Sequence, residues 1–415
     1  MKIGAIRRTG TAGEDTIEAR VEWEDAGRPP FDLHFSFLSG DVPAADPNAF
    51  LIAVFVAALR DGERRIAVEG AICPVLRDGL RAAAAVLGSW YGGDRRMPAL
   101  EPSEGFRAGY PPAAGGEAIF LSGGLDSLDL LLSRGAGLPR EHPAAVRRAI
   151  FVTRCGLFPD EPQLAETGAR SERAVRATAA EAGLPLTVVS TNLLGLQGSL
   201  RSFALESHGS FFAAIAQLLS GRVSTVALAA SDDVMSGLHP WGSHPLLDPL
   251  FGTSAVRFVH DGIGIKREEK AARVGGSEPG RRHLYTCSFP LPGDPLLNCG
   301  RCEKCLRTMV ELLVAGALAE SETFPRDVTA DAIRSLPGVP SYRRLDYYWE
   351  PMASGARRAG RPDLADAIDE RLEANRRAEE WERDRGWTGL LRRLDRRWLG
   401  GRALAFRRRI ARGAR

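Results

Sequence analysis

The residues best suited to chemistry form a short segment rich in serine and glycine, Ser122-Gly-Gly-Leu-Asp-Ser127. The apolar run at 118–121 indicates a buried strand before it, and the leucines at 128–132 indicate a helix after it. A tight glycine turn between a strand and a helix presents backbone N–H groups and the helix dipole to an anion. Ser122 and Ser127 add hydroxyl donors, whereas Asp126 suits a phosphate site only with a Mg²⁺ ion between them. The segment predicts a phosphate cradle, the alternative being a turn that binds nothing.

Four cysteines form a second group, with the spacing C-x11-C-x2-C-x2-C: Cys287, Cys299, Cys302 and Cys305. Four thiolates in a tetrahedral array suit a closed, structural Zn²⁺ site. An iron–sulfur cluster is the main alternative, because ferredoxins also use cysteines at this spacing, but the usual following Cys-Pro is absent. The pattern therefore favours zinc in a reducing compartment over disulfides or free thiols.

The elements around these residues alternate between strand and helix. Helical patterns at 161–182 and 210–219 separate the apolar runs that predict strands, which are 118–121, 149–153, 186–189 and 225–229. This alternation is typical of an α/β fold with a parallel sheet covered by helices. Ligands of such sheets bind beyond the carboxyl ends of the strands. We therefore expect a single rim to carry 122–127, Thr153, 190–192 and 231–233.

The rest of the chain predicts additional parts. Residues 1–112 alternate as half-buried strands with two apolar helices and predict a separate α+β accessory domain without catalytic residues. We expect the parallel-sheet domain to span 117–320 and to include the cysteine knuckle at 287–305. A helical extension at 321–385 and a basic tail at 386–415 follow.

Charge and hydropathy restrict the location and partners of the chain. The net charge of +3 divides into +9 over residues 386–415, where ten arginines accompany one acid, and −6 before them. Tryptophans and leucines at helical spacing make this tail a basic amphipathic helix that suits a membrane surface, nucleic acid or an acidic partner, unless it simply docks on the protein. We expect no signal peptide, because residues 1–8 lack an apolar core, and the longest apolar run, 49–59, is too short to cross a bilayer. We expect a cytoplasmic protein.

The segment 122–127 resembles the Ser-Gly-Gly-x-Asp-Ser loop of the ATP pyrophosphatase (PP-loop) family, whose domain is adenine nucleotide α-hydrolase-like. The resemblance implies cleavage of ATP to AMP and pyrophosphate, with activation of a substrate oxygen as its adenylate. It implies that ATP and Mg²⁺ are held by loop and rim residues, namely Ser122, Gly123, Gly124, Leu125, Asp126, Ser127 and Thr153.

The same resemblance assigns cations to the phosphates of ATP. PP-loop enzymes place a lysine-bearing helix beside them, and the charged helix at 265–274 corresponds to it with Lys266, Arg267 and Lys270. A solvated helix with Glu–Lys pairs is the alternative. His208 opens the helix at 210–219 and would either touch substrate or cap the helix. Asp126, Lys270 and His208 are the candidate catalytic residues.

The loop combined with the cysteine knuckle resembles 7-cyano-7-deazaguanine synthase over about residues 117–315, but not over the first 112 or the last hundred. This resemblance implies adenylation of a carboxylate or similar oxygen on a small-molecule or macromolecular acceptor, followed by attack of ammonia or an amine. The interpretation also allows a homodimer. The alternatives are modification of tRNA or DNA, including sulfur transfer, and a nucleotide-sensing component of a multi-protein system. Sulfur transfer lacks a cysteine pair, because Cys155 alone follows the second strand.

Overall fold

The computed structural model describes residues 1–11, 13–38, 43–93, 95–111, 116–135, 138–139, 142, 145–154, 162–234, 238–287, 293–336 and 346–383. Two compact units divide the chain, Met1–Asp327 and Val328–Arg415. The first is an α/β structure built on a mostly parallel sheet, and the second is helical, which confirms the expected fold class in outline. Cys155 and the predicted tail at 386–415 lie outside the described residues.

Within the described residues, one sheet holds ten strands in the order β10-β9-β6-β7-β8-β3-β2-β1-β4-β5. The strands are β1 (Lys2–Thr11), β2 (Glu14–Glu22), β3 (Phe31–Phe37), β4 (Arg65–Val68), β5 (Ala99–Pro102), β6 (Gly116–Phe120), β7 (Val146–Arg154), β8 (Leu186–Thr191), β9 (Val223–Ala229) and β10 (Arg257–Asp261). The strands β10, β9, β6, β7 and β8 are mutually parallel. Their carboxyl ends therefore lie at one rim, as the sequence predicts.

The N-terminal strands continue this sheet. β3 pairs antiparallel with β8, with Phe35 opposite Thr191 and Phe37 opposite Val189. One hydrophobic core contains buried residues from both sides of this seam, among them Phe35 and Phe120. The sheet therefore continues across the domain boundary expected near residue 112, because backbone pairing joins segments more than 150 residues apart in sequence.

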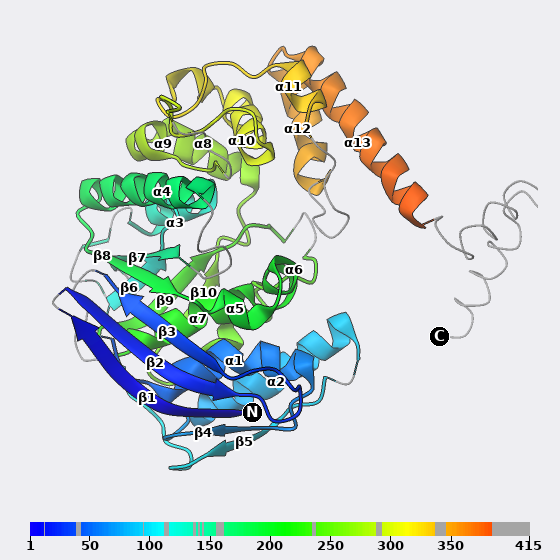
Figure 1. The fold of residues 1–415 in the computed structure, drawn as a ribbon. Coiled ribbons are helices and arrows are strands. Elements are labelled where there is room, and N and C mark those ends of the chain that lie inside the picture. The colour runs from blue at the N-terminus through cyan, green and yellow to red at the C-terminus, as the bar shows by residue number, and fades with distance from the viewer. Residues whose placement is uncertain are drawn as a thin grey trace, which may run out of the picture. The chain divides into compact units, whose positions relative to one another are not determined.

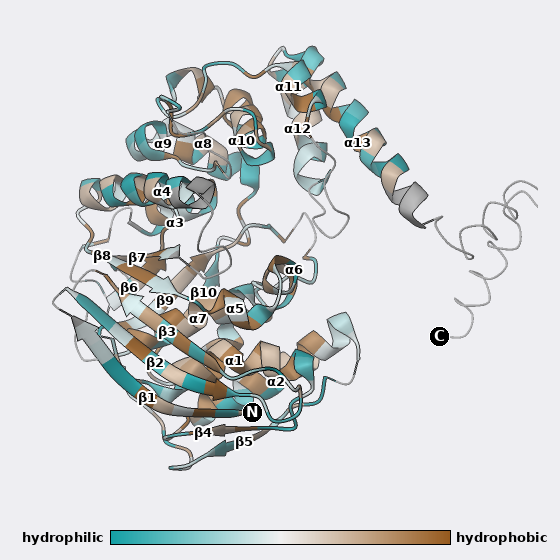
Figure 2. Cartoon of the chain, viewed as in Figure 1, coloured by the Kyte–Doolittle hydropathy of each residue, from teal (hydrophilic) through white to brown (hydrophobic). Residues whose placement is uncertain are grey.

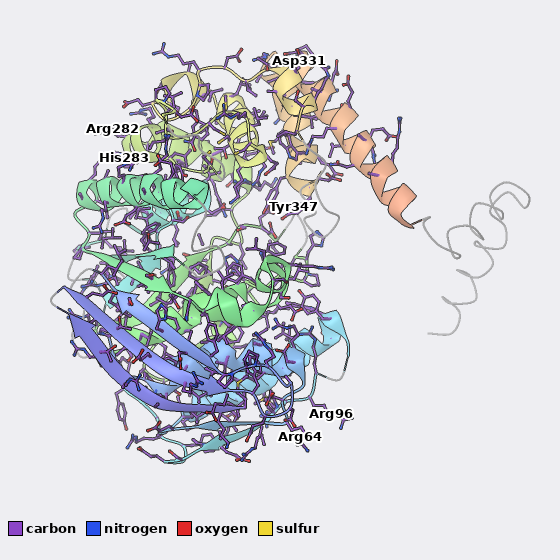
Figure 3. All side chains as sticks on the ribbon, in the orientation of Figure 1. Arg64, Arg96, Arg282, His283, Asp331 and Tyr347 are labelled. Atoms are coloured by element: carbon purple, nitrogen blue, oxygen red, sulfur yellow. The ribbon has the colours of Figure 1, made fainter. Side chains whose placement is uncertain are left out.

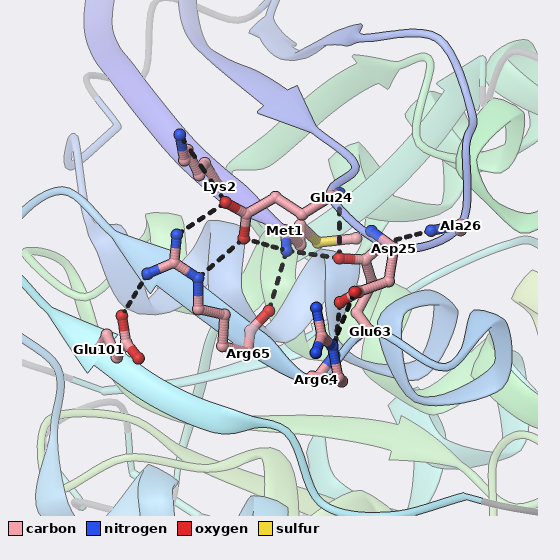
Figure 4. Close-up of polar contacts among 9 residues, drawn as sticks. All are labelled: Met1, Lys2, Glu24, Asp25, Ala26, Glu63, Arg64, Arg65 and Glu101. Atoms are coloured by element: carbon pink, nitrogen blue, oxygen red, sulfur yellow. Dashed lines mark hydrogen bonds and ion pairs between the residues drawn. The ribbon is translucent and has the colours of Figure 1, made fainter.

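A network of hydrogen bonds and ion pairs joins the start of β1 to β4 (Figure 4). The amine of Met1 donates to buried Glu63 and, at 3.0 Å, to Glu24. Arg65 also pairs with Glu24 and with Glu101, at 2.7 Å in each case. Hydrogen bonds from Arg65 and from the amine lower the pKa of Glu24 to about 2. Glu24 is therefore ionised at neutral pH and links β1 to β4.

Helices cover both faces of the sheet (Figure 1), with α1, α2 and α7 on one side and α3, α4, α8, α9 and α10 on the other. The first group is α1 (Pro47–Asp61), α2 (Pro74–Tyr91) and α7 (His208–Leu218). The second group is α3 (Leu125–Gly135), α4 (Pro162–Glu181), α8 (Arg267–Gly276), α9 (Glu278–His283) and α10 (Glu303–Val314). Short turns are α5 (Leu194–Gln197), α6 (Leu200–Ser202), the π-helix η1 (Phe203–Ser207), η2 (Asp248–Phe251) and η3 (Leu318–Glu320).

The helix α1 shows why these segments fold as they do. Residues 49–59 of this helix are all buried, and the brown colour of α1 in Figure 2 shows that most of the helix is apolar. Asp46 accepts from the backbone N–H of Asn48 at its start, and Gly62 ends it at a φ of 77°, which favours glycine. The strands β1, β5 and β10 were not expected, because their apolar alternation is too weak to read without their partners.

The second unit contains α11 (Ala330–Arg334), α12 (Asp346–Arg358) and α13 (Pro362–Arg383). Trp349 of α12 and Ile368 of α13 are buried, and Arg334 pairs with Glu370 at 2.7 Å. These contacts hold the predicted helical extension together. Across the described part of both units, every helix is too short or too polar to traverse a lipid bilayer.

Candidate functional site

The glycine loop lies between β6 and α3 at the carboxyl rim. The Oγ atoms of Ser122 and Ser127 lie 3.1 Å apart, and Ser127 donates to the carbonyl of Gly124 at 3.0 Å. Gly123 has a φ of +78°, and a Cβ there would lie 3.3 Å from Val175 Cγ2, so glycine is needed on both counts. The chain makes a closed turn whose two hydroxyls meet at the start of a helix. Leu125, which is 2% exposed, anchors this helix in the interior.

Two cations from α8 converge on Asp126. Arg267 Nη1 lies 3.0 Å from both carboxylate oxygens, and Lys270 Nζ lies 3.5 Å from Oδ1. Lys270 is 1% exposed and also donates to the carbonyl of Ala230, beyond the end of β9, at 2.6 Å. Glu311 of α10 holds Arg267 from the other side, with its Oε1 2.6 Å from Nε. Of the three cations that the resemblance assigned to the phosphates, Arg267 and Lys270 contact Asp126.

The electrostatics of Asp126 differ from those of Asp129, one turn later in the same helix. Burial works to raise the pKa of Asp126, but the charges of Arg267 and Lys270 outweigh it and hold this pKa below its ordinary value. For Asp129, burial raises the pKa more than Arg273 lowers it, although Arg273 Nη1 lies 2.6 Å from Oδ1. Asp126 is therefore the ionised carboxylate that keeps the two cations beside the loop.

In the described part of the chain, three of the expected site residues form no hydrogen bond or ion pair with the glycine loop. The hydroxyl of Thr153 donates to Glu172 of α4 at 3.3 Å, and Lys266 is exposed at the start of α8. His208 opens α7 on the opposite face of the sheet, its ring 5.0 Å and 5.1 Å from those of Phe203 and Phe212. Burial lowers the pKa of His208 to about 4, so it is neutral at physiological pH. Within the described residues, no hydrogen bond joins His208 to the loop.

Beside His208 lies a polar cluster that the sequence did not reveal. Asp248 is fully buried, and its Oδ2 lies 2.8 Å from His260 Nδ1 and accepts from Ser243 at 2.7 Å. Close backbone approach makes this possible, because a Cβ on Gly209 would lie 1.9 Å from Asp248 Oδ1. The residue His260 was missed because its strand, β10, was not predicted.

Glu311 was also missed, although the sequence contains a signal for it. It is an acid within an otherwise apolar stretch of α10 and is 4% exposed. Such an acid is rarely buried without a partner. Its partner, Arg267, lies in a distant segment and could not be identified from spacing.

The four cysteines converge as predicted. Their Sγ atoms all lie within 4.8 Å of one another, and those of Cys299 and Cys305 are 3.8 Å apart. Thiolates around one tetrahedral Zn²⁺, with bonds of about 2.3 Å, lie roughly 3.8 Å apart. A four-iron cluster would separate them further, because each cysteine would bind a different iron. The cluster can therefore hold a single metal ion such as zinc.

The close sulfurs shift one another's pKa values. Donation from Cys287 and the other two thiols holds the pKa of Cys299 far below that of an ordinary cysteine. The same interactions raise the pKa of Cys287 and Cys305 above it. A metal ion bound among the four sulfurs would hold them as thiolates.

Asn298 joins the two separate parts of the cysteine cluster. Its Oδ1 accepts from the backbone N–H groups of Thr286 and Cys287, at 2.8 and 3.1 Å. Its Nδ2 donates to the carbonyls of Leu284 and Thr323. The side chain of Asn298 therefore positions Cys287 beside the other three cysteines.

The chain was compared with models of known protein families, with curated proteins and with solved structures. None of the three comparisons gives a significant match.

Proposed function

We propose that the protein is an ATP-dependent adenylating enzyme that converts ATP to AMP and pyrophosphate and activates a carboxylate or similar oxygen for attack by ammonia or an amine. The observation that carries the proposal is the pairing of Arg267 and Lys270 with Asp126 beside the loop at 122–127. A glycine turn at a helix start, with two cations next to it, is an arrangement suited to a polyphosphate. The resemblance to the PP-loop family selects ATP among polyphosphates.

The charge balance explains how ATP would enter. Arg267 and Lys270 are matched by Asp126 and Glu311, so these four side chains sum to zero net charge. Incoming phosphates would compete with Asp126 for the two cations. Asp126, once released, is an oxygen ligand of the type that Mg²⁺ prefers, and Mg²⁺ would neutralise the remaining phosphate charge. The hydroxyls of Ser122 and Ser127 would donate to the phosphates.

The chemistry then follows from which phosphate is attacked. The acceptor oxygen forms a bond to the α-phosphorus while the bond to the β-phosphate oxygen breaks, and Arg267 and Lys270 stabilise the departing pyrophosphate. Ammonia next attacks the activated carbon, AMP leaves, and a proton from nitrogen passes to water. Preorganised donors of this kind are worth about 10²–10³ in rate each.

The cysteine cluster would have a structural role. We propose that it binds Zn²⁺ closed on four sulfurs, because such sites leave no position open for substrate. The helix α10 begins beside Cys302 and carries Cys305, and two turns later Glu311 contacts Arg267. The metal would therefore fix the helix that positions one of the two cations.

The test supplies ATP, Mg²⁺ and ammonium with 7-carboxy-7-deazaguanine and other carboxylic acids, and separates the nucleotides by chromatography. Acid-dependent AMP and pyrophosphate are expected from the wild type. Asp126→Ala should nearly abolish turnover, whereas Asp129→Ala, a buried acid in the same helix, should retain it. ADP as the sole acid-dependent product would refute the mechanism.

A further inference from the structure

A cavity of about 490 Å³, widely open to solvent, lies away from the glycine loop, at the seam between the N-terminal strands and the rest of the sheet. Its polar lining comes from both sides of that seam: Arg28, Arg60, Asp61, Gln197, Ser199 and Ser202. The first three flank β3 and end α1, whereas the last three follow β8. The cavity therefore depends on the pairing of β3 with β8.

The cavity wall carries an excess of positive charge. Arg28 Nη1 lies 2.7 Å from Asp61 Oδ2, and Arg60 Nε lies 3.0 Å from Asp61 Oδ1. One carboxylate is thus shared by two guanidinium groups, which leaves a net charge of +1. Arg28 is further fixed, with its Cζ 4.2 Å from the ring centre of Trp23 and a hydrogen bond of 3.1 Å to the carbonyl of Leu196. A wall of this charge attracts an anion.

Polar atoms of the wall are also left without partners. Gln197 is 1% exposed, and within the described residues neither Nε2 nor Oε1 of its amide forms a hydrogen bond. The Nη1 atom of Arg60 is likewise buried without a partner. Buried polar atoms nearly always have hydrogen-bond partners, and these three exceptions belong to two residues that line the same cavity.

We propose that this cavity is a second binding site, for a small molecule that carries an oxyanion, either carboxylate or phosphate. The guanidinium groups of Arg28 and Arg60 would donate to the oxyanion, because the guanidinium fork suits carboxylate and phosphate alike. The buried amide of Gln197 would turn toward the ligand and add a donor from Nε2. Gln197 Oε1 would accept from a hydroxyl or amine on the same molecule. The site is separate from the glycine loop and does not depend on the proposed ATP chemistry.

The test uses a local reporter, because phosphate would also bind at the glycine loop. Trp23 stacks against Arg28, so ¹⁹F NMR of protein labelled with 5-fluorotryptophan reports occupancy of the cavity, with Trp23→Phe to assign its signal. Inorganic phosphate and L-glutamate are titrated separately as the two oxyanion sources. A saturable shift of the Trp23 signal with either probe supports the site and identifies the source. No shift with either probe at tens of millimolar overturns it.

Matched arginine variants test the assignment of residues. Arg60→Gln should raise the half-saturating concentration by about tenfold or more, because it removes a charged donor. Arg64→Gln is the control, since Arg64 lies exposed at the surface (Figure 3) and pairs with Asp25 (Figure 4). Equal effects of the two substitutions, or none from Arg60→Gln, would contradict the proposal.

Gln197→Leu provides an independent measurement that does not rely on the arginines. If the amide lacks partners without ligand, removing it should leave the melting temperature of the free protein unchanged or raise it. The same variant should bind the successful probe more weakly. A clear fall in the melting temperature of the free protein would show that the amide is already satisfied, and would overturn the proposal.

Discussion

Replacing Asp126 by Asn tests the arrangement at the glycine loop, because it removes one charge and nearly preserves the shape. Asp126 faces Arg267 at 3.0 Å and Lys270 at 3.5 Å, and the ammonium group of buried Lys270 also donates to the neutral carbonyl of Ala230. Breaking a buried ion pair by removing one partner costs about 3–5 kcal/mol. The side chain of Asp126 is 22% exposed, so water screens part of the interaction and we expect the lower value, about 3 kcal/mol.

The expected change in melting temperature follows from the size of the unit. Unfolding entropy is about 2.1 cal/mol/K per residue, so a loss of about 3 kcal/mol over Met1–Asp327 should lower the melting temperature by roughly 4 °C. Differential scanning calorimetry at pH 7 measures it. Asp129→Asn is the control: burial outweighs Arg273 there, so this substitution should leave the melting temperature unchanged or raise it.

Low pH should reduce the difference in melting temperature between the wild type and Asp126→Asn. The pKa of Asp126 is lowered in the folded protein, so its contribution is complete above the unfolded pKa of about 4 and is lost as the pH falls below it. The two melting temperatures should therefore approach each other below about pH 4. Equal melting temperatures at pH 7, or an equal loss in Asp129→Asn, would refute the reasoning.

Three further predictions concern the cysteine cluster and the region of His208. Metal analysis should find about one zinc per chain, lost in Cys302→Ser but kept in the buried control Cys73→Ser; iron and sulfide would contradict this. Gly242→Ala would place a Cβ 2.7 Å from the backbone nitrogen of His208 and should cost about 1–3 kcal/mol in urea unfolding, whereas Gly264→Ala, with open space, should cost little. By NMR, His208 should titrate near pH 4. Because this pKa is lowered from about 6.5, stability should decline as the pH falls from about 6.5 to about 4, and a midpoint near 6.5 would contradict the burial argument.

Local pattern accounts for much of the fold. The alternation of apolar runs predicted β6, β7, β8 and β9 and the helices between them. These elements were accessible because each is defined by its own periodicity and caps. The strands β1, β5 and β10 were not, because each depends on neighbours from elsewhere in the chain.

The candidate site, like the fold, has parts that the sequence predicts and parts that only the tertiary structure decides. The sequence by itself determined the glycine turn with its serines and the cysteine spacing, since each is set by chemistry within a few residues. Only the tertiary structure decided that Arg267 and Lys270 reach Asp126 while Lys266 remains exposed, because adjacent residues of a helix point in different directions.

Long-range pairing decided the remaining features. The cavity beside Gln197 and the burial of Glu311 against Arg267 both join segments far apart in the chain. Hydrogen bonds and ion pairs act over a few ångströms in space, whatever the separation in sequence. The sequence therefore determined which chemical groups are present, and the fold decided which of them meet.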